Sequence, residues 1–503
     1  MHLPSLSLET LNLYLLCPAL SIIYSIYSIL SSYRRLSHIP GPLQAHFTSL
    51  YITSTAFHGN LDTTCDTLHA KYGPLVRIGP NSLLLSDFSE LSRIQGVRSS
   101  YYRSDWNNAI RFDSELCQDS VTTIMNAQEH AARKAKLKQG YEGKSAGGWD
   151  KVVDEQIEEL IGLLRRYIKE KGGIVDWARV ERFFVVDVTT AAVTGRPWGG
   201  LKSDSDVYGL FEAGDRLAGW IFAIGSWGVV RRVVYTWWFV KRMGPFNPRN
   251  EKGLGRWWGI VKELVKERAS KPDEKRGDML TDWLAQGMTP HQCELDAVLA
   301  VVASSDGTST AIRSILLHLV SATYAYNKLK SEIAEAIKKG TVSDPATNSE
   351  ARQLLYLQAV LYEGIRIVPG IVTGFPKCVP PKGDTICEIR VPGGTEIFQN
   401  HRAVMLDRRV FGHDVHTFRP ERWIECSSEQ KILMTRHVDS LFGFGRWQCL
   451  GRTLAWVEIN KLFVELLRNF NFQIANPSKP WRLKAYTTTS IDGFLVRVSD
   501  GVL

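Results

Sequence analysis

The chain carries the stretch Phe442-Gly-Phe-Gly-Arg-Trp-Gln-Cys449-Leu-Gly451, followed directly by Arg-Thr-Leu-Ala-Trp-Val-Glu, a run that favours a helix. One cysteine therefore stands in a glycine-rich loop just before a helix N-terminus, where backbone N–H groups and the helix dipole stabilise a thiolate. Gly445 allows a sharp turn, Gly451 lets a flat ligand approach the backbone, and Phe442 supplies an apolar wall. The pattern predicts a site for anionic sulfur.

A haem held by Cys449 is the ligand that suits these residue types together. An isolated cysteine is more often a buried core thiol, and the bracketing glycines argue against that alternative here. The eight cysteines of the chain show no CxxC pair. Their scatter argues against a zinc site and a disulfide framework, so we expect the catalytic domain in a reducing compartment.

The N-terminal segment predicts a membrane anchor. Residues Leu11 to Tyr33 carry no charge and come close to the roughly 20 residues that span a bilayer. Arg34 and Arg35 follow at once, which places the body of the protein on the cytosolic side. A cleaved signal peptide is the alternative, but no basic region precedes the apolar run. We therefore expect an anchor at 1–35 and one catalytic domain at 36–503, joined by the stiff Pro40-Gly-Pro42 exit.

The whole chain has 503 residues, of which 44% are hydrophobic and 22% charged, as expected of a globular protein with a large core. A net charge of +9 suits an anionic membrane surface or an acidic protein partner. Basic and acidic residues interleave, so nucleic acid is not the expected partner. The tryptophan-rich segment 220–238 contains Arg231 and Arg232, which favours an interfacial segment or ordinary core over a second span.

Hydrophobic periodicity predicts an α+β protein that is mainly helical with small sheets. Two short strands are expected in 76–85 around a Gly-Pro-Asn turn, and helices dominate 120–340, with clear three- and four-residue spacing in 156–169 and 254–269. Short strand patterns return in 386–391 and 395–398. This order is not the alternation of a βαβ protein.

Glu363 and Arg366 stand three residues apart on a predicted helix and share a face. Arg422, in Phe418-Arg-Pro-Glu-Arg422-Trp, could bind the same carboxylate and lock the helix to a loop. Weak surface ion pairs are the alternative. With the Pro40-Gly-Pro42 exit and the Cys449 loop, this order of motifs resembles the cytochrome P-450 superfamily of haem-thiolate monooxygenases. Tyr72-Gly-Pro-Leu-Val-Arg-Ile-Gly-Pro-Asn81 and Phe418 resemble its fungal microsomal branch, particularly pisatin-demethylase-like enzymes.

The resemblance implies that Cys449 is the axial ligand of haem b, that Glu363, Arg366 and Arg422 form a structural triad beneath the haem loop, and that His130 and Lys134 reach the haem propionates. For the neighbouring Arg133, Lys136 and Lys138, a solvated basic face and a docking face for an acidic reductase domain remain open.

The family's arginine two residues before the cysteine is replaced by Trp447. Either Arg446 reaches the propionate from a shifted loop, or Trp447 makes a weaker N–H contact.

Ala303-Ser-Ser-Asp306-Gly307-Thr308 occupies the place of the family's oxygen-activating helix. Asp306 holds the acid position, but Gly307 stands where a hydroxyl residue is expected and Ser304 replaces a glycine. Thr308 becomes the predicted hydroxyl for proton transfer, with an ordered water or a substrate hydroxyl as the alternative. A third interpretation is that these polar residues only cap or bend the helix.

The resemblance implies a monooxygenase of the endoplasmic reticulum membrane, with electrons from NADPH–cytochrome P-450 reductase, possible support from cytochrome b5 and an apolar small-molecule substrate of fungal secondary metabolism. Segments 101–111, 211–227 and 368–375 are expected to line its access channel. Two rivals stay open: a haem-thiolate isomerase, dehydratase or peroxide-using enzyme, which the missing hydroxyl at 307 favours, and a non-catalytic haem sensor or carrier.

Overall fold

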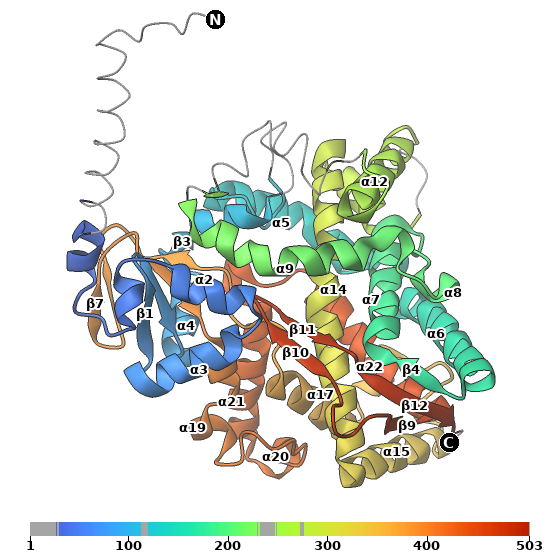
Figure 1. The fold of residues 1–503 in the computed structure, drawn as a ribbon. Coiled ribbons are helices and arrows are strands. Elements are labelled where there is room, and N and C mark those ends of the chain that lie inside the picture. The colour runs from blue at the N-terminus through green and yellow to red at the C-terminus, as the bar shows by residue number, and fades with distance from the viewer. Residues whose placement is uncertain are drawn as a thin grey trace, which may run out of the picture.

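A helix of 32 residues, α14 (Pro290–Ser321), runs through the middle of the computed structural model (Figure 1). Its start is set by a capping box, in which the Thr289 side chain accepts from the Gln292 N–H and the Gln292 side chain bonds back to Thr289. Pro290 occupies the first helical position, where no donor is lost. Helices α7, α12 and α17 pack along it, so α14 is the axis around which the helical part is assembled.

The structure describes residues 27, 30–111, 119–228, 230–231, 247, 249–271 and 276–501. Helices account for most of them. Their bounds are α2 (Leu50–Phe57), α3 (Leu61–Tyr72), α4 (Phe88–Gln95), α5 (Ala127–Tyr141), α6 (Asp150–Lys171), α7 (Trp177–Thr194), α8 (Gly200–Ser203), α9 (Leu210–Ser226), α12 (Gly253–Ala269), α13 (Met279–Ala285), α15 (Thr323–Lys338), α16 (Asn348–Ala351), α17 (Leu355–Ile367), α18 (His401–Met405), α19 (Arg408–Phe411), α20 (Arg422–Glu425), α21 (Ser428–Asp439) and α22 (Arg452–Asn469).

The strands form small sheets at the margins of the helical body (Figure 1). The largest has the order β1-β2-β8-β5-β3, a second has β4-β12-β9, and β6-β7 and β10-β11 are separate pairs. The bounds are β1 (Leu75–Gly79), β2 (Ser82–Leu85), β3 (Tyr102–Arg103), β4 (Ile174–Asp176), β5 (Lys377–Cys378), β6 (Asp384–Ile386), β7 (Ile389–Val391), β8 (Glu396–Gln399), β9 (Phe470–Ile474), β10 (Arg482–Ala485), β11 (Thr489–Asp492) and β12 (Leu495–Asp500).

The mainly helical α+β class with small sheets is confirmed. The segments 156–169 and 254–269 lie within α6 and α12, and the expected strands in 76–85 are β1 and β2, paired antiparallel. The later strand patterns correspond to β6, β7 and β8, of which β8 joins β2 in parallel. Periodicity identified these elements because each buries one clear face or lies entirely in the core.

The predicted anchor lies almost wholly outside the described residues, of which only 27 and 30–35 belong to segment 1–35. Among the described residues, no helix is both long enough and apolar enough to cross a bilayer.

Trp237 and Trp238 of the predicted interfacial segment are also outside the described part. Within it, Trp220 on α9 is 53% exposed, and the Arg231 guanidinium donates to the Gly225 carbonyl at 2.7 Å.

Arg77 in β1 joins the start of the described chain to the first sheet. Its guanidinium is fully buried, and burial lowers its pKa to about 10, with the charge of Arg35 acting in the same direction. Carbonyl oxygens satisfy its donors instead of a carboxylate. They belong to Ser32, Tyr33, His46, Gly79 and Pro80, at 2.8–3.4 Å. Arg77 therefore sets the path along which residues 32–46 approach the domain.

Two glycines bring α17 and the loop after it into backbone contact with α14. A Cβ atom added to Gly364 would lie 2.8 Å from the Ile315 Cα atom. One added to Gly370 would lie 3.1 Å from the Gly307 carbonyl oxygen. Larger residues at 364 would push the two helices apart, since core atoms cannot yield at this separation.

We expect Gly364→Ala to lower the free energy of unfolding by about 1–3 kcal/mol, because the new methyl group overlaps α14. Gly162→Ala is the matched control, since Gly162 also lies inside a helix but has nothing within 4 Å of an added Cβ. It should gain about 0.5–1 kcal/mol from lower chain entropy. Denaturant unfolding of both variants makes the comparison. Equal effects would show that the contact between the helices is looser than described.

Candidate functional site

The loop that carries Cys449 turns twice on glycines. Gly443 and Gly445 have φ values of +71° and +54°, which favour residues without a Cβ. Gly445 also packs so closely on the chain that an added Cβ would lie 3.0 Å from the Val97 N atom. The Cys449 N–H donates to the Phe442 carbonyl at 2.6 Å and closes the loop. Helix α22 then begins at Arg452, directly after the loop.

The Cys449 side chain is accessible to solvent, yet desolvation by surrounding protein is the largest influence on its pKa and raises it. The N–H groups of Gly451 and Arg452 and the charges of Lys134 and Arg452 act in the opposite direction and lower the pKa. The loop therefore presents the sulfur together with donors and cations that favour its anionic form.

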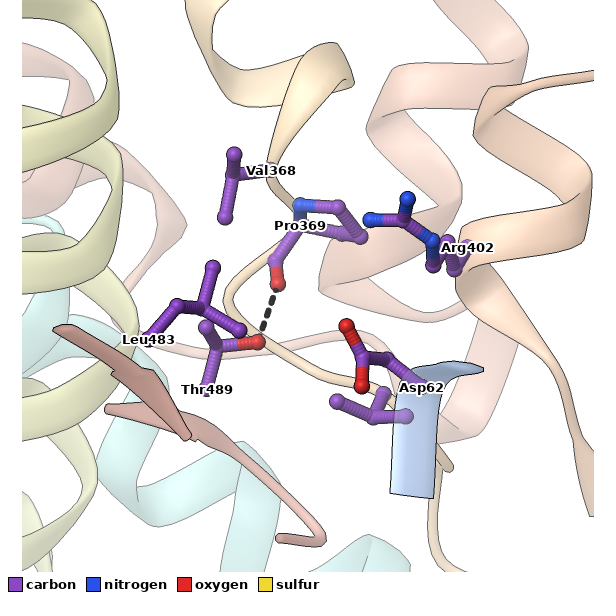
Figure 2. Close-up of a pocket in the computed structure, with 7 residues that line it drawn as sticks. Asp62, Val368, Pro369, Arg402, Leu483 and Thr489 are labelled. Carbon is purple, nitrogen blue, oxygen red and sulfur yellow. Dashed lines mark hydrogen bonds between the residues drawn. The ribbon is translucent and has the colours of Figure 1, made fainter. Parts of the chain in front are cut away.

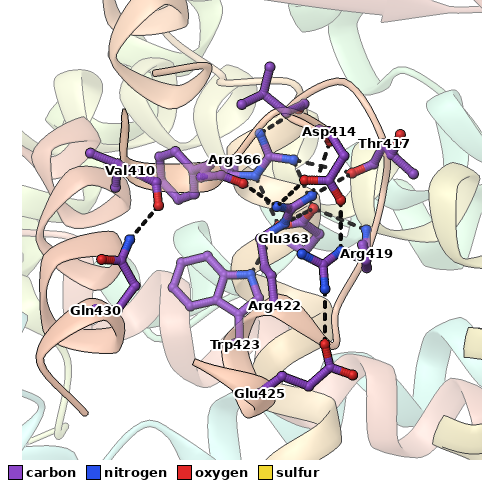
Figure 3. Close-up of polar contacts among 12 residues, drawn as sticks. Glu363, Arg366, Val410, Asp414, Thr417, Arg419, Arg422, Trp423, Glu425 and Gln430 are labelled. Carbon is purple, nitrogen blue, oxygen red and sulfur yellow. Dashed lines mark hydrogen bonds and ion pairs between the residues drawn. The ribbon is translucent and has the colours of Figure 1, made fainter. Parts of the chain in front are cut away.

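In α17, the carboxylate of Glu363 is fully buried and receives five hydrogen bonds (Figure 3). Arg366 donates from Nε at 2.9 Å and from Nη2 at 2.7 Å. Arg422 donates from Nε at 2.9 Å, and the Trp423 indole donates at 3.0 Å. The Arg419 backbone N–H adds the fifth, at 3.1 Å. Burial raises the pKa of Glu363, but these donors outweigh it and hold the pKa below its ordinary value.

The two guanidiniums also bind the chain between α18 and α20. Arg366 donates to the Met405 and Val415 carbonyls at 3.1 and 2.7 Å. Arg422 donates to the Phe411 carbonyl and binds the Asp414 carboxylate at 3.0 Å. The ion pairs are thus interior contacts between α17 and a distant loop, unlike surface pairs of small energy.

A second group of charged residues surrounds the Trp447 indole. Arg103 in β3 and Lys377 in β5 are directly opposite each other in the antiparallel pair, and they are only 6% and 5% exposed. The Arg103 guanidinium lies 4.7 Å and the Lys377 Nζ 4.3 Å from the Trp447 ring centroid. The His130 ring of α5 lies 5.0 Å from the Trp447 ring, tilted by 37°. Like charges at directly opposite positions are unfavourable, so this arrangement favours an anion between them.

Electrostatics and unpaired donors support an anion site there. Burial, then the charges of Arg103 and Arg446, lower the pKa of Lys377 to about 7. Burial and the same positive charges lower the pKa of His130 to about 3. Arg103 Nε, His130 Nδ1 and Trp447 Nε1 are buried without a hydrogen-bond partner. Among the described residues, no carboxylate forms an ion pair with Arg103 or Lys377.

Lys134 and Arg446 lie beside this group but use their donors on backbone. Lys134 Nζ donates to the carbonyls of Arg446 and Gln448, at 2.9 and 2.6 Å, and so holds the Cys449 loop against α5. Arg446 donates to the Ser99 carbonyl and, at 3.4 Å, to that of Val97. Of the neighbouring basic residues, Arg133 is no solvated side chain, because it forms a buried ion pair with Asp296 at 2.8 Å.

The middle of α14, residues 302–308, is accessible, while the stretches on either side of it, 293–301 and 309–317, are buried. Ala303 is exposed, and a Cβ added to Gly307, one turn later, would meet nothing within 4 Å. These two residues mark an open face of the helix. Asp306 lies to one side of it, with Oδ1 3.6 Å from the Arg182 guanidinium and Oδ2 accepting from the Thr488 hydroxyl at 3.3 Å. Thr308 is partly buried on the other side.

The tip of the β10-β11 hairpin is fastened to α14 and to the loop after α17. The Thr310 hydroxyl donates to the Thr489 carbonyl at 2.7 Å, and the Thr489 hydroxyl donates to the Pro369 carbonyl at 2.7 Å (Figure 2). A small pocket opens at this junction, and it contains none of the predicted site residues. Its lining is Asp62, Val368, Pro369, Val372, Arg402, Leu483 and Thr489.

The three segments expected to line an access channel meet at Trp106. Its ring lies 6.0 Å from that of Phe222 in α9 and 5.9 Å from that of Phe375. Phe398 of β8 completes the cluster, also at 5.9 Å. Gly225 of α9 packs against the same indole so closely that no side chain would fit. The short 3-10 helix η2 (Asp105–Ile110) and α9 are therefore joined by aromatic contacts.

Comparison with known proteins identifies the family. The family model for cytochrome P-450 matches residues 40–491. The chain belongs to the cytochrome P-450 family. It is 34% identical over 496 residues to cytochrome P-450 monooxygenase ABA1 of Pyricularia oryzae, with 96% of each chain covered. It is 33% identical over 471 residues to aba1 of Botryotinia fuckeliana, with 92% of each covered. It is 27% identical to cicH of Emericella nidulans, with 92% of this chain and 94% of that protein covered.

A cytochrome P-450 holds haem iron through a cysteine thiolate, and the residues of this chain fit that group. Cys449 is accessible and stands in the loop before α22. The buried donors of Arg103, His130 and Trp447 that have no hydrogen-bond partner, together with the positive charges of Arg103 and Lys377, suit two propionates. We expect these residues to hold the propionates, and Lys134 to hold the loop.

Sequence reasoning did not find Arg103, Lys377, Arg182 or Thr488. Each lies outside the motifs, and each reaches the site through strand pairing or helix packing between distant segments. The only local signal was the absence of the usual arginine at 447, which required propionate partners from elsewhere. Likewise, the absence of a hydroxyl at 307 indicated that a hydroxyl near Asp306 would have to come from another segment.

We expect Glu363→Gln to lower the free energy of unfolding by about 3–5 kcal/mol, because it leaves the buried Arg366 guanidinium without its carboxylate and leaves Arg422 with only the partly exposed Asp414. Asp414→Asn is the control, since Asp414 binds the same Arg422 but is 38% exposed. It should cost about 1 kcal/mol or less. Thermal unfolding and haem content of the purified variants measure both. Similar losses in the two variants would contradict the central position of Glu363.

Lys377→Met should accelerate haem loss about 10- to 100-fold, the effect expected when one charge-assisted hydrogen bond is removed. Lys136→Met is the control, because Lys136 donates to the Gly287 carbonyl at the surface and away from Trp447. Transfer of haem to a haem-free globin in excess measures the rate. Unchanged haem loss in Lys377→Met would show that this lysine does not contact the cofactor.

Proposed function

We propose that this chain is a haem-thiolate monooxygenase in which Cys449 is the axial ligand of haem b. It would use dioxygen and electrons from NADPH to hydroxylate or otherwise oxidise an apolar small molecule of fungal secondary metabolism. The observation that carries the proposal is an accessible cysteine sulfur, set before α22, in a chain whose Trp447 indole is bordered by the buried Arg103 and Lys377, which form no ion pair with a carboxylate among the described residues. The monooxygenase names of the fungal relatives support the same reaction class.

When bound, the haem supplies the chemistry of dioxygen activation, favoured by electron donation from the thiolate. The chain's own residues place it and control protons. Cys449 binds from one side, and Gly445 and Phe442 shape the loop around the sulfur. Asp306 and Thr308 border the open face of α14, where protons would be delivered, and the aromatic contacts at Trp106 keep bulk water from the substrate side.

We further propose a single-pass anchor in 1–35 that holds the domain 36–503 at the cytosolic face of the endoplasmic reticulum membrane. The uncharged run in 11–33, followed by Arg34 and Arg35, supports this topology. NADPH–cytochrome P-450 reductase would be the electron donor, with cytochrome b5 as an additional one. The net charge of +9 supports an acidic redox partner.

A second candidate function keeps the haem but not the reductive activation of dioxygen. Gly307 favours it, since the helix carries no hydroxyl at the position where the family usually has one. An isomerase, a dehydratase or a peroxide-using enzyme would need no NADPH. Turnover that continues without NADPH and reductase would select this candidate over the monooxygenase.

Replacing the predicted ligand tests the proposal. Cys449→Ala should abolish the thiolate-type spectrum of the ferrous carbon monoxide complex and all NADPH-dependent product formation, because no other group can donate thiolate electron density. Cys426→Ala is the control, since Cys426 is partly buried at the end of α20, and it should keep both. Metabolite profiling after gene deletion supplies the substrate. A thiolate spectrum in Cys449→Ala would refute the assignment.

A further inference from the structure

The acid of α14 has a hydroxyl partner that does not belong to α14. Asp306 is followed by Gly307, so the adjacent position offers no side chain. Successive helical residues are rotated by about 100°, which puts Asp306 and Thr308 on opposite flanks of the open face. Thr308 therefore cannot orient the Asp306 carboxylate directly. The hydroxyl that contacts it belongs to Thr488, which donates to Asp306 Oδ2 at 3.3 Å.

Backbone contacts on both sides fix the position of Thr488. Thr488 forms an isolated antiparallel bridge with Ile371, in the loop that follows α17. Its neighbours are tied as well, since the Val372 N–H donates to the Thr487 carbonyl at 3.0 Å and the Thr489 N–H donates to the Gly370 carbonyl at 2.9 Å. Gly370 in turn packs on the Gly307 backbone. The Thr488 side chain thus projects from a rigid tip next to the acid.

Arg182 of α7 faces the second oxygen of the same carboxylate. Its guanidinium lies 3.6 Å from Asp306 Oδ1 and forms a shorter pair, at 2.9 Å, with Asp215 of α9. The Arg182 guanidinium attracts Asp306, but its shorter contact is with Asp215 and not with Asp306 Oδ1. The side chain of Asp306 is 41% exposed. Among the described residues, the Thr488 hydroxyl is thus the side-chain donor that hydrogen-bonds to this accessible carboxylate, at 3.3 Å.

We propose that Thr488 is a positioning residue for Asp306 and takes the part that a hydroxyl next to the acid would otherwise have. The inference rests on the proposed monooxygenase function and names the residue that orients its acid. The Thr488 O–H donates to the carboxylate, and its oxygen remains free to accept from a water molecule. The carboxylate is thereby held toward the hairpin tip, in one geometry for proton delivery.

Coupling between electrons and product tests the inference. Electrons that do not reach the substrate leave as hydrogen peroxide, in which one dioxygen has taken up two electrons and two protons. In the reconstituted holoenzyme with NADPH and reductase, Thr488→Val should lower product formed per NADPH about tenfold and release peroxide instead, as expected when a charged acceptor loses one donor. The carbon monoxide spectrum should stay that of the wild-type protein.

Two further variants separate the hydroxyl from the shape of the side chain. Thr488→Ser keeps the O–H and should keep the coupling of the wild-type protein. Thr487→Val is the matched control, because the Thr487 hydroxyl is buried without a hydrogen-bond partner one position earlier in the same hairpin tip, and its removal should change nothing. Loss of coupling in Thr488→Ser as well as in Thr488→Val would assign the effect to packing and overturn the inference.

A double-mutant cycle, measured by thermal unfolding, provides a readout that does not depend on turnover. Thr488→Val, Asp306→Asn and the double variant should show non-additive changes in Tm, with a single-variant loss of about 1–2 °C for Thr488→Val. Additive changes would mean that the two side chains do not interact. If the wild-type protein makes no product with NADPH, the monooxygenase proposal fails whatever the cycle gives. If the wild-type protein is coupled and Thr488→Val is equally coupled, only the positioning by Thr488 fails.

Discussion

The fully buried carboxylate of Glu363 is the constraint on which the arrangement around Cys449 depends. A charge removed from water is unfavourable unless each of its lone pairs is satisfied, and five donors from Arg366, Arg419, Arg422 and Trp423 do so. Those donors come from α17 itself and from residues 56 to 60 positions later, at Arg419 and the start of α20. The chain then passes through α21 to Cys449, so the satisfied carboxylate holds α17 against the segment that leads to the cysteine loop.

Charge is divided between the two sides of the candidate site. Around Trp447, the opposed pair of Arg103 and Lys377 forms a positive region without an ion-pair partner in the described part of the chain. At the middle of α14, Asp306 is the acid, and Arg182 and Thr488 define its orientation. The positive region suits an anionic group, and the carboxylate at the middle of α14 suits the proton delivery that we propose. Different side chains would then serve the two roles.

Local features of the fold could be predicted from sequence, and contacts between distant segments could not. Helices α6 and α12 and strands β1 and β2 show their own periodicity, and Glu363 and Arg366 share one helical turn. Arg103 and Lys377 meet only because β3 pairs with β5, a register that neither two-residue strand specifies by itself. The loop donors near Cys449 could be predicted from the sequence, whereas the contribution of Lys134 depends on how α5 packs against the loop.

The glycine contacts between α17 and α14 decide which parts of the enzyme can move. With Gly364 against Ile315 and Gly370 against Gly307, no side-chain layer separates the two segments, so sliding or tilting would bring backbone into backbone. The acid, the carboxylate at 363 and the hairpin tip accordingly behave as one rigid body. The contact between α9 and η2 is made instead by the rings of Phe222 and Trp106, and a side-chain contact of this kind can adjust by rotation where a backbone contact cannot.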